Sequence, residues 1–249
     1  MNHALVTGGG SGVGRAIALA LADAGAMVTI CGRRPEAVAA VAAEHERISA
    51  IPADVTDEAA VVALYEQAEA ARGPFDLVVA NAGLASSAPA SRVSLDEWQE
   101  TLAINLTGAF LTVRPALESM RKRGRGRIVF IASTAGLKGY AYVTPYVAAK
   151  HGVIGLMRAL AVETARSGIT VNAVCPGFTE TDMLETSIER IVETTGRSAE
   201  AARASLAASN PQGRFIQPDE IAATVLWLAS DAAASVTGQA ISISGGETW

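Results

Sequence analysis

The sequence predicts an α/β fold, a doubly wound parallel β-sheet in a single domain that spans residues 1–249. Short runs rich in β-branched residues alternate with long Ala-rich amphipathic stretches. This alternation is typical of a parallel sheet covered by helices on both faces. No repeat, linker or shift in composition divides the chain, and its length suits one such domain, since these commonly reach about 250 residues.

Seven runs are expected to be strands, and helix-sized segments separate them: 4–7, 27–31, 48–53, 75–80, 127–133, 169–175 and 240–244. Helix start signals support the segments between. Ser94 and Glu97 have the spacing of a capping box, and Thr56 or Asp57 can cap the helix that follows them.

The segment 178–217 interrupts this rhythm with about two extra helical pieces, and we expect it to be a helical insertion over one edge of the sheet. In its first piece the apolar residues fall on one helical stripe: Met183, Leu184, Ile188, Ile191 and Val192. The stripe should therefore lie against an apolar surface. Two interpretations remain open, a lid over a site and an ordinary core helix.

Composition restricts the class of protein. Half of the residues are hydrophobic and 18% are charged, which excludes intrinsic disorder, and the formal charge of −5 disfavours partners such as nucleic acid or an anionic membrane. A strand starting at His3 leaves no room for a leader, and no apolar stretch approaches the ~18 residues of a membrane span, so we expect a cytoplasmic protein. Cys31 and Cys175 lack metal-ligand spacing, so we expect reduced core thiols and no metal site.

The first expected strand runs directly into a glycine-rich loop, Thr7–Gly14 with the sequence TGGGSGVG, and an Ala-rich helix follows. Glycines allow positive φ, while backbone amides and the helix N-terminus bind a pyrophosphate. The order therefore predicts a Rossmann-type dinucleotide site. Its expected contacts are Gly8, Ser11, Gly12, Val13 and Gly14. The spacing differs from G-x-G-x-x-G, and a glycine turn without a ligand is the alternative.

The end of the second expected strand suggests which dinucleotide is preferred. At the place where an acidic residue would bind the ribose 2′-OH, the sequence has Gly32, Arg33 and Arg34. Guanidinium groups suit a 2′-phosphate, because they form bidentate, charge-assisted hydrogen bonds. NADP(H) is therefore favoured over NAD(H), the alternative being that both arginines are simply solvated.

Three polar residues should converge at the carboxyl edge of the sheet. Tyr146 and Lys150 are four apart in an expected helix, and Ser133 ends the strand 127–133. A free phenol has a pKa of about 10, so a Tyr that acts as acid and base near neutrality needs a nearby cation. Lys150 and a cationic nicotinamide would supply it, while Ser133 would bind a carbonyl or hydroxyl group. The set predicts hydride transfer between a ketone and a secondary alcohol.

These ordered motifs resemble the short-chain dehydrogenase/reductase family over essentially the whole chain. Asn105 completes a match to the family's catalytic tetrad with Ser133, Tyr146 and Lys150. The resemblance implies that Tyr146 is the acid/base and that Lys150 holds the nicotinamide ribose and tunes Tyr146. It also implies that Ser133 positions the carbonyl and that Asn105 holds a water in a proton relay.

Further motifs match the family's cofactor site and assembly. Asp54 and Val55 resemble the pair beside the adenine, and Asn81, Ala82 and Gly83 resemble the motif after the fourth strand. The segment with Pro176, Gly177, Thr179 and Thr181 is similar to the one that meets the nicotinamide carboxamide. The ending 239–246 resembles the last strand and turn through which many relatives form tetramers, which implies a homotetramer or homodimer.

The substrate is expected to be a small carbonyl or alcohol compound. The insertion and the segments 210–214 and 217–221 resemble ketoreductases that act on β-ketoacyl thioesters, including those of aromatic polyketide synthesis. This implies an NADP(H)-dependent 3-oxoacyl thioester reductase or 3-hydroxyacyl dehydrogenase, with Arg190, Arg197 or Arg203 near the pantetheine or phosphates. The alternatives are a cyclic, aromatic or sugar ketone, and a non-catalytic cofactor-binding sensor.

Overall fold

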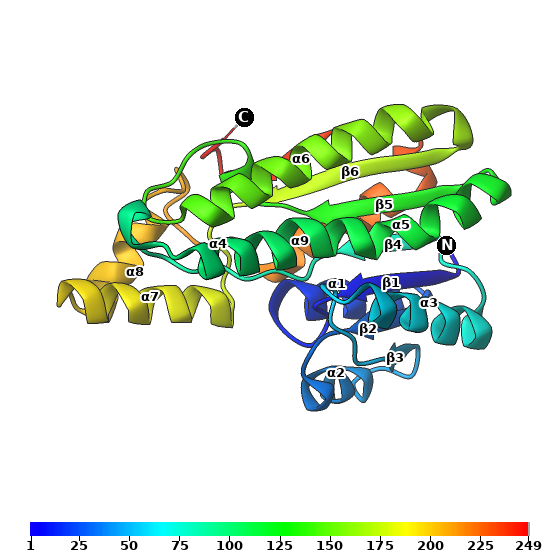
Figure 1. Ribbon diagram of the computed structural model, residues 1–249, viewed down its shortest axis with the longest axis horizontal. Coiled ribbons are helices and arrows are strands. Elements are labelled where there is room, and N and C mark those ends of the chain that lie inside the picture. The colour runs from blue at the N-terminus through cyan, green and yellow to red at the C-terminus, as the bar shows by residue number, and fades with distance from the viewer. Residues whose placement is uncertain (249) are drawn as a thin grey trace.

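The computed structural model describes residues 1–248, and their strands form one seven-stranded parallel sheet of order β3-β2-β1-β4-β5-β6-β7 (Figure 1). The strands are β1 (His3–Thr7), β2 (Met27–Cys31), β3 (Ile48–Ala50), β4 (Leu77–Ala80), β5 (Gly126–Ile131), β6 (Ile169–Pro176) and β7 (Ala240–Ile243). Each lies within or beside a run predicted as a strand. The predicted doubly wound, Rossmann-type α/β fold is confirmed.

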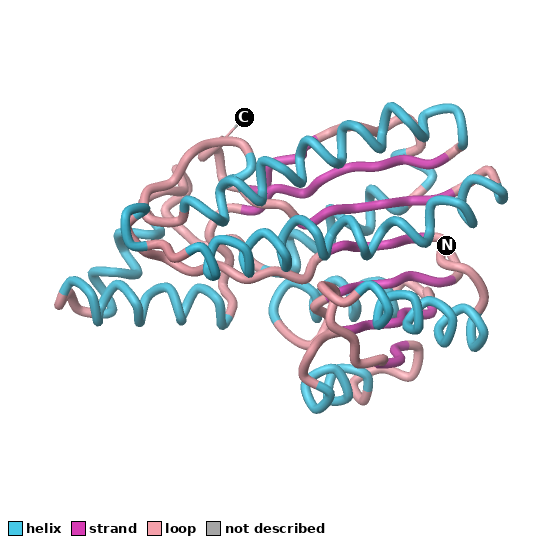
Figure 2. The backbone as a smooth tube through the Cα atoms, viewed as in Figure 1, coloured by secondary structure: helices cyan, strands magenta, loops and turns pink. Residues whose placement is uncertain are grey.

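Helices cover both faces of the sheet, as Figure 2 shows. They are α1 (Gly12–Asp23), α2 (Pro35–Ala42), α3 (Glu58–Arg72), α4 (Leu95–Leu102), α5 (Gly108–Arg123), α6 (Thr144–Thr164), α7 (Asp182–Thr195), α8 (Ala199–Ala207) and α9 (Pro218–Ala229). Successive β5 residues point to opposite faces. Ile128 and Phe130 share a core with α3, α5 and α6, whereas Val129 and Ile131 share one with α1, α2 and α9.

The predicted helix starts are formed by side-chain caps. The Ser94 hydroxyl accepts a hydrogen bond from the Glu97 amide at 3.1 Å, and the Glu97 carboxylate accepts one from the Ser94 amide at 2.8 Å. Asp57, rather than Thr56, caps α3 by accepting from the amides of its first turn. Thr56 instead donates its hydroxyl proton to Asp54. Satisfying the free amides of the first turn stabilises each helix start.

The sequence was expected to form neither a membrane-spanning helix nor a metal site, and the structure describes residues 1–248. In that part of the chain no helix is long and apolar enough to cross a membrane. The same residues contain no group of three or more His, Cys, Asp or Glu side chains placed to hold a metal ion. Cys31 and Cys175 are both buried free thiols, as expected of core cysteines.

The segment 178–217 contains two helices, α7 and α8, which lie beyond the carboxyl ends of the strands (Figure 1). Leu184 and Ile188 of α7 form a small separate core with Ala202 and Phe215. The prediction that Met183 lies with this stripe against an apolar surface is wrong, because the residue is 43% exposed. Neighbouring helix positions point about 100° apart, so α8 covers Leu184 and leaves Met183 uncovered.

Candidate active site

The site begins where the strand order reverses, between β1 and β4. Ligands of open parallel sheets bind in the crevice at such a point. The Thr7 hydroxyl accepts hydrogen bonds from the amides of Asn81 at 3.0 Å and Ala82 at 3.1 Å, and the Asn81 side chain donates to the Thr7 carbonyl at 2.8 Å. Thr7 was not among the predicted site residues, although its position directly before Gly8 indicates that it belongs to the glycine-loop motif. It ties the glycine loop to the loop after β4.

At Gly8 and Gly14 the glycine loop has no room for a side chain. Gly8 and Gly12 have positive φ, at 66° and 50°. A Cβ on Gly14 would lie 2.2 Å from the Gly8 carbonyl oxygen, and one on Gly8 would lie 2.9 Å from the Asn81 amide nitrogen. The backbone therefore turns tightly from β1 into the N-terminus of α1, and a helix N-terminus is suited to bind a pyrophosphate.

A cavity of about 210 Å³ adjoins this loop. Eight of the predicted cofactor-binding residues line it: Gly8, Ser11, Arg33, Arg34, Asp54, Val55, Ala82 and Gly83. Its other lining residues were not among the predicted contacts: Gly10, Gly32, Ala37, Val38, Ala53 and Ile104. Gly10 and Gly32 belong to the motifs already noted, and Ile104 directly precedes the predicted Asn105. The predicted Gly12, Val13, Gly14 and Asn81 are not among the residues that line the cavity.

The charges at this cavity favour an anionic ligand. Arg33 and Arg34 are exposed at the start of α2, and neither guanidinium has a hydrogen bond or ion pair within residues 1–248. Asp54 is the one carboxylate on the cavity wall within the described residues. Its Oδ1 accepts from the Thr56 amide at 2.9 Å, which lowers the pKa of Asp54, and Arg33 lowers it further. The exposed guanidiniums therefore fit an anionic group of a dinucleotide.

Ser133, Tyr146 and Lys150 come together beside this cavity. Ser133 follows β5 and begins the 3₁₀ turn Thr134–Gly136, where its hydroxyl accepts from the Ala135 amide at 3.1 Å. Lys150 Nζ lies 5.5 Å from the centre of the Tyr146 ring. Burial raises the pKa of Tyr146, and hydrogen bonding with the Ser133 side chain acts in the opposite direction. The predicted convergence of these three residues is therefore present in the fold.

Lys150 is an unusual buried cation. Only 4% of the residue is exposed, and its Nζ donates to the Ile131 carbonyl at 2.9 Å. Burial lowers the pKa of Lys150 to about 8, because removal from water disfavours the charged form. A group with this pKa can gain or lose a proton near neutrality, and its charge responds strongly to a neighbouring anion.

Asn105 lies in a π-helical turn, Ala103–Thr107, between α4 and α5. Its amide nitrogen donates to the carbonyls of Leu84 at 2.9 Å and Thr101 at 3.0 Å, and its Oδ1 accepts from the Leu84 amide at 3.3 Å. One amide proton thus fixes the loop after β4 through Leu84, and the other bonds back to Thr101 of α4. A Cβ on Gly83 would lie 2.8 Å from Asn105 Oδ1 and 3.7 Å from Lys150 Nζ, so the two polar groups flank Gly83.

Two glycines that the sequence interpretation missed allow these elements to approach. A Cβ on Gly136 would lie 2.8 Å from the Lys150 carbonyl oxygen, and one on Gly152 would lie 2.8 Å from Leu106. The turn after Ser133 and the π-helical turn of Asn105 therefore both pack directly on α6. A glycine three residues after Ser133 was the available signal for the first contact.

The segment after β6 closes the opposite side of the site. The Gly177 amide donates to the Ile243 carbonyl at 3.0 Å, and the Thr179 hydroxyl donates to the Gly177 carbonyl at 3.0 Å. Thr181 begins α7, and its methyl group would lie 3.2 Å from a Cβ on Gly12. The predicted segment from Pro176 to Thr181 thus returns to the glycine loop.

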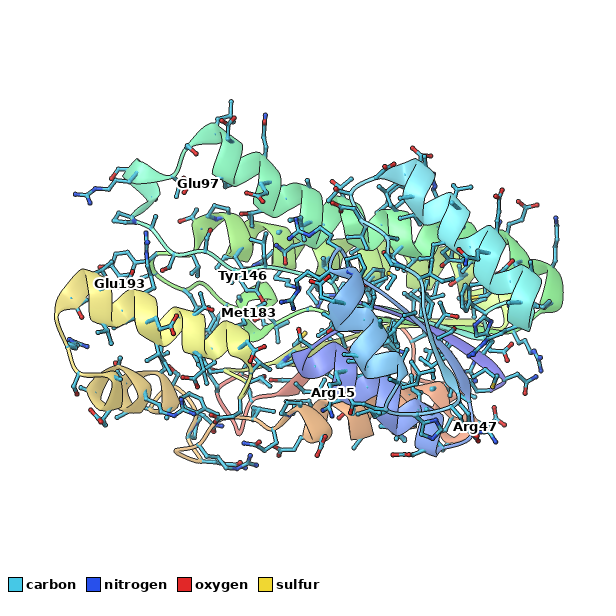
Figure 3. All side chains as sticks on the ribbon, turned by 90° about the horizontal axis from the view of Figure 1, so that it is seen from below. Arg15, Arg47, Glu97, Tyr146, Met183 and Glu193 are labelled. Atoms are coloured by element: carbon cyan, nitrogen blue, oxygen red, sulfur yellow. The ribbon has the colours of Figure 1, made fainter. Side chains whose placement is uncertain are left out.

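A second hollow, of about 410 Å³, lies near the start of α6. Its lining was not predicted from the sequence: Ala90, Val93, Ser94, Leu95, Trp98 and Thr144. In the view of Figure 3, Tyr146 lies between α4, which carries Glu97, and α7, which carries Met183. Thr144 is two residues before Tyr146, so the hollow lies near the start of the helix that carries Tyr146.

Comparison with known proteins identifies the family. The family model described as short chain dehydrogenase matches residues 2–191. The chain belongs to the short-chain dehydrogenase family. The dehydrogenase is 40% identical to a protein of Streptomyces violaceoruber named ketoacyl reductase 1 of the granaticin polyketide synthase, with 98% of this chain and 92% of the relative covered. It is also 40% identical to an acetoacetyl-CoA reductase of Rhizobium meliloti, with 98% and 97% covered.

A solved structure is similar over the whole dehydrogenase. It is a variant of actinorhodin polyketide ketoreductase with NADPH, which matches with a TM-score of 0.96 and 38% identity over 99% of this chain and 97% of that one. The predicted resemblance is therefore confirmed. This short-chain dehydrogenase is an NAD(P)-dependent oxidoreductase that interconverts a ketone and a secondary alcohol.

Proposed function

We propose that this dehydrogenase is an NADP(H)-dependent ketoreductase whose substrate is a 3-oxoacyl thioester of CoA or an acyl-carrier protein. One observation carries the cofactor part of the proposal. Residues of the glycine loop, Arg33 and Arg34 line one cavity. Tyr146 and Lys150 lie beside this cavity at the same edge of the sheet. Names of relatives such as ketoacyl reductase and acetoacetyl-CoA reductase support the substrate part.

The proposed catalytic residues are Asn105, Ser133, Tyr146 and Lys150. NADPH, when bound, supplies the hydride that reduces the carbonyl carbon. Ser133 orients the carbonyl oxygen by hydrogen bonding, and Tyr146 transfers its phenolic proton to that oxygen as it becomes an alcohol. Lys150 stabilises the resulting phenolate. Asn105 holds the loop that contains Gly83 beside Lys150. Asn105 also holds a water molecule, through which a proton returns to Tyr146.

The proposed cofactor contacts divide between the two ends of NADP(H). The adenosine phosphate end would be bound by Gly8, Ser11, Gly12, Val13, Gly14, Arg33, Arg34, Asp54, Val55, Asn81, Ala82 and Gly83. The nicotinamide end would be bound by Tyr146, Lys150, Pro176, Gly177, Thr179 and Thr181. The tight glycine turn, the exposed guanidiniums and the return of Thr181 to Gly12 support this division.

We expect a clear preference for NADPH over NADH. Replacing Arg33 and Arg34 together with Ala should weaken NADPH far more than NADH, because each lost phosphate contact removes about 1.5–3 kcal/mol. Comparing kcat/KM and Kd for both cofactors measures this preference. Arg166 is an exposed arginine just before the amino end of β6, so Arg166→Ala is the matched control. It should leave kcat/KM and Kd unchanged for both cofactors. Equal kcat/KM for the two cofactors in the starting protein would contradict the assignment.

The substrate class is tested by NADPH oxidation with acetoacetyl-CoA, cyclic ketones, aromatic ketones and sugars. The proposal expects the highest kcat/KM with acetoacetyl-CoA. A higher value with a cyclic, aromatic or sugar ketone would favour that alternative class. Tight NADPH binding without turnover on any of them would instead support a non-catalytic sensor.

We propose that the segment 178–217 selects the substrate and closes over it. Arg203 is not free to approach a pantetheine or phosphate, since it pairs with Glu180 and Glu185. Hydrogen bonds from Ser94 lower the pKa of the Glu97 carboxyl group on α4, and Arg190, the single arginine of α7, lowers it slightly further. This supports a site mouth flanked by α4 and α7.

We expect amide hydrogen exchange in the segment 178–217 to slow on addition of NADPH and product, because closure buries its backbone. The strands of the sheet serve as the internal reference and should exchange equally in both states. A segment that is equally protected with and without ligand would leave the ordinary structural helix as the interpretation.

We also propose a homotetramer or homodimer. Phe110 on α5, Val162 on α6 and Trp227 on α9 are exposed large apolar side chains, which supports burial against another copy. The molar mass in solution, measured by light scattering, tests this, and a monomer at micromolar concentration would contradict it.

A further inference from the structure

A second tyrosine, Tyr140, lies in the loop between Ser133 and Tyr146. Its hydroxyl donates to Glu247 Oε1 at 2.6 Å. Because that hydroxyl has a single proton, the Thr134 hydroxyl must be the donor in the 2.6 Å hydrogen bond that joins Thr134 to Tyr140. A continuous series of hydrogen bonds therefore runs from Thr134, the neighbour of Ser133, through Tyr140 to Glu247. We call these three residues the C-terminal clamp.

The clamp is enclosed and charged. Only 2% of the Glu247 side chain is exposed, and its Oε1 is also paired with Lys138 Nζ at 3.0 Å. A Cβ on Gly177 would lie 3.1 Å from Glu247 Oε2, so the carboxylate rests against the backbone after β6. Buried carboxylates are costly unless they are paired and hydrogen-bonded. Lys138 and Tyr140 meet this requirement at Oε1, whereas Oε2 is buried without a hydrogen-bond partner among the described residues.

The two tyrosines of this region have opposite partners. Burial raises the pKa of Tyr140, and the Glu247 carboxylate raises it further, so its phenol stays protonated as a hydrogen-bond donor. Tyr146 instead has the Lys150 cation beside its ring. Tyr140 is thus suited to hold structure, and its ring packs edge-to-face on Phe178 at 6.2 Å. The clamp joins the turn after Ser133, the segment after β6 and the end of the chain.

We propose that Tyr140 and Glu247 are positioning residues for ketone reduction, because their hydrogen bonds fix Thr134 and thereby the turn that presents the Ser133 hydroxyl. Neither residue touches the reacting atoms. The proposal rests on the function proposed above, in which Ser133 orients the carbonyl oxygen. A displacement of about 1 Å at such a group can lower the rate of the chemical step by about 10²-fold.

The test compares Tyr140→Phe, Glu247→Ala and the double variant, with kcat and KM for the ketone, Kd for NADPH and Tm measured for each. We expect each single variant to lower kcat by about 10- to 100-fold with Kd for NADPH unchanged. The kcat of the double variant should be no lower than that of the worse single variant, because both substitutions break the same series of hydrogen bonds. Glu247→Gln should recover most of kcat, since its amide oxygen still accepts from Tyr140.

Two controls separate the clamp from general stability. Tyr142→Phe changes an exposed tyrosine of the same loop and should leave kcat unchanged. Lys138→Met removes the ion pair but keeps the hydrogen bonds from Thr134 to Glu247, so kcat should stay within about twofold, while Tm should fall because a buried carboxylate loses its cation. Full kcat in Tyr140→Phe or in Glu247→Ala, with or without a fall in Tm, would overturn the clamp's positioning role.

Ser133→Ala distinguishes this proposal from the function on which it rests. If Ser133→Ala lowers kcat while the clamp variants do not, only the clamp proposal fails. If Ser133→Ala retains full kcat, the proposed role of Ser133 fails, and the clamp's positioning role fails with it. If Ser133→Ala and the clamp variants lower kcat alike, while Kd for NADPH stays constant, both proposals are supported.

Discussion

Replacing Tyr146 with Phe should almost abolish ketone reduction while leaving the Kd for NADPH within a few-fold. The substitution removes the phenolic oxygen and its transferable proton but keeps the ring beside Lys150. Loss of a general acid typically lowers the rate by about 10²- to 10⁴-fold. The measurements are kcat from NADPH oxidation and Kd from titration of the cofactor, made on the same preparation.

Two further tyrosines make this test specific. Tyr142→Phe, at an exposed position of the preceding loop, should retain full activity. Tyr140→Phe should be impaired through position rather than proton transfer, so it should retain the pH profile of the starting enzyme at a lower kcat. A Tyr146→Phe enzyme that keeps most of its kcat would overturn the assignment of the acid.

Replacing Lys150 with Met should lower both NADPH affinity and kcat, and it should also change how stability depends on pH. The pKa of Lys150 falls from 10.5 to about 8 on folding, because burial disfavours the cation. Below pH 8 both states carry the proton, and the folded state bears the full cost of the buried charge. Between about pH 8 and 10.5 the unfolded state holds more protons, so the free energy of unfolding of the wild type rises with pH.

The Met variant lacks this proton and therefore lacks the rise. Its free energy of unfolding, relative to wild type, should be higher near pH 7 than near pH 10.5 by about 3 kcal/mol, at about 1.4 kcal/mol for each unit of pKa. Denaturant unfolding of both cofactor-free proteins at the two pH values measures the change. The lost hydrogen bond to the Ile131 carbonyl lowers the variant's stability equally at both, so it cancels. A pH-independent difference would contradict a depressed Lys150 pKa.

Some features of this dehydrogenase follow from local sequence. The alternation of β-branched runs with Ala-rich segments predicts the parallel sheet, and the glycine loop after β1 predicts the cofactor end of the crevice. Tyr146 and Lys150 share a helix face because their spacing is one turn. The capping box at Ser94 is local as well. In each case the residues that determine the structure are neighbours along the chain, so their pattern alone carries the information.

Other features depend on residues that are distant in the sequence. The Thr7 hydroxyl joins β1 to Asn81, and Gly83 brings Asn105 beside Lys150. Met183 is exposed although its helical stripe is apolar, because the position of α8 decides which side of α7 is covered. Similarly, only the folded chain shows that Arg203 is held by Glu180 and Glu185.

The C-terminal clamp is the strongest example of what the tertiary structure alone decides. Tyr140 and Glu247 are 107 residues apart, and neither belongs to a recognisable motif. Local patterns specify the period and ends of each helix and strand, since these depend on backbone geometry and nearby side chains. Hydrogen bonds between distant side chains depend instead on how the finished layers place their loops. The sequence by itself therefore determined the sheet and the Tyr146–Lys150 pair, while tertiary packing decided which groups hold the turn that contains Ser133.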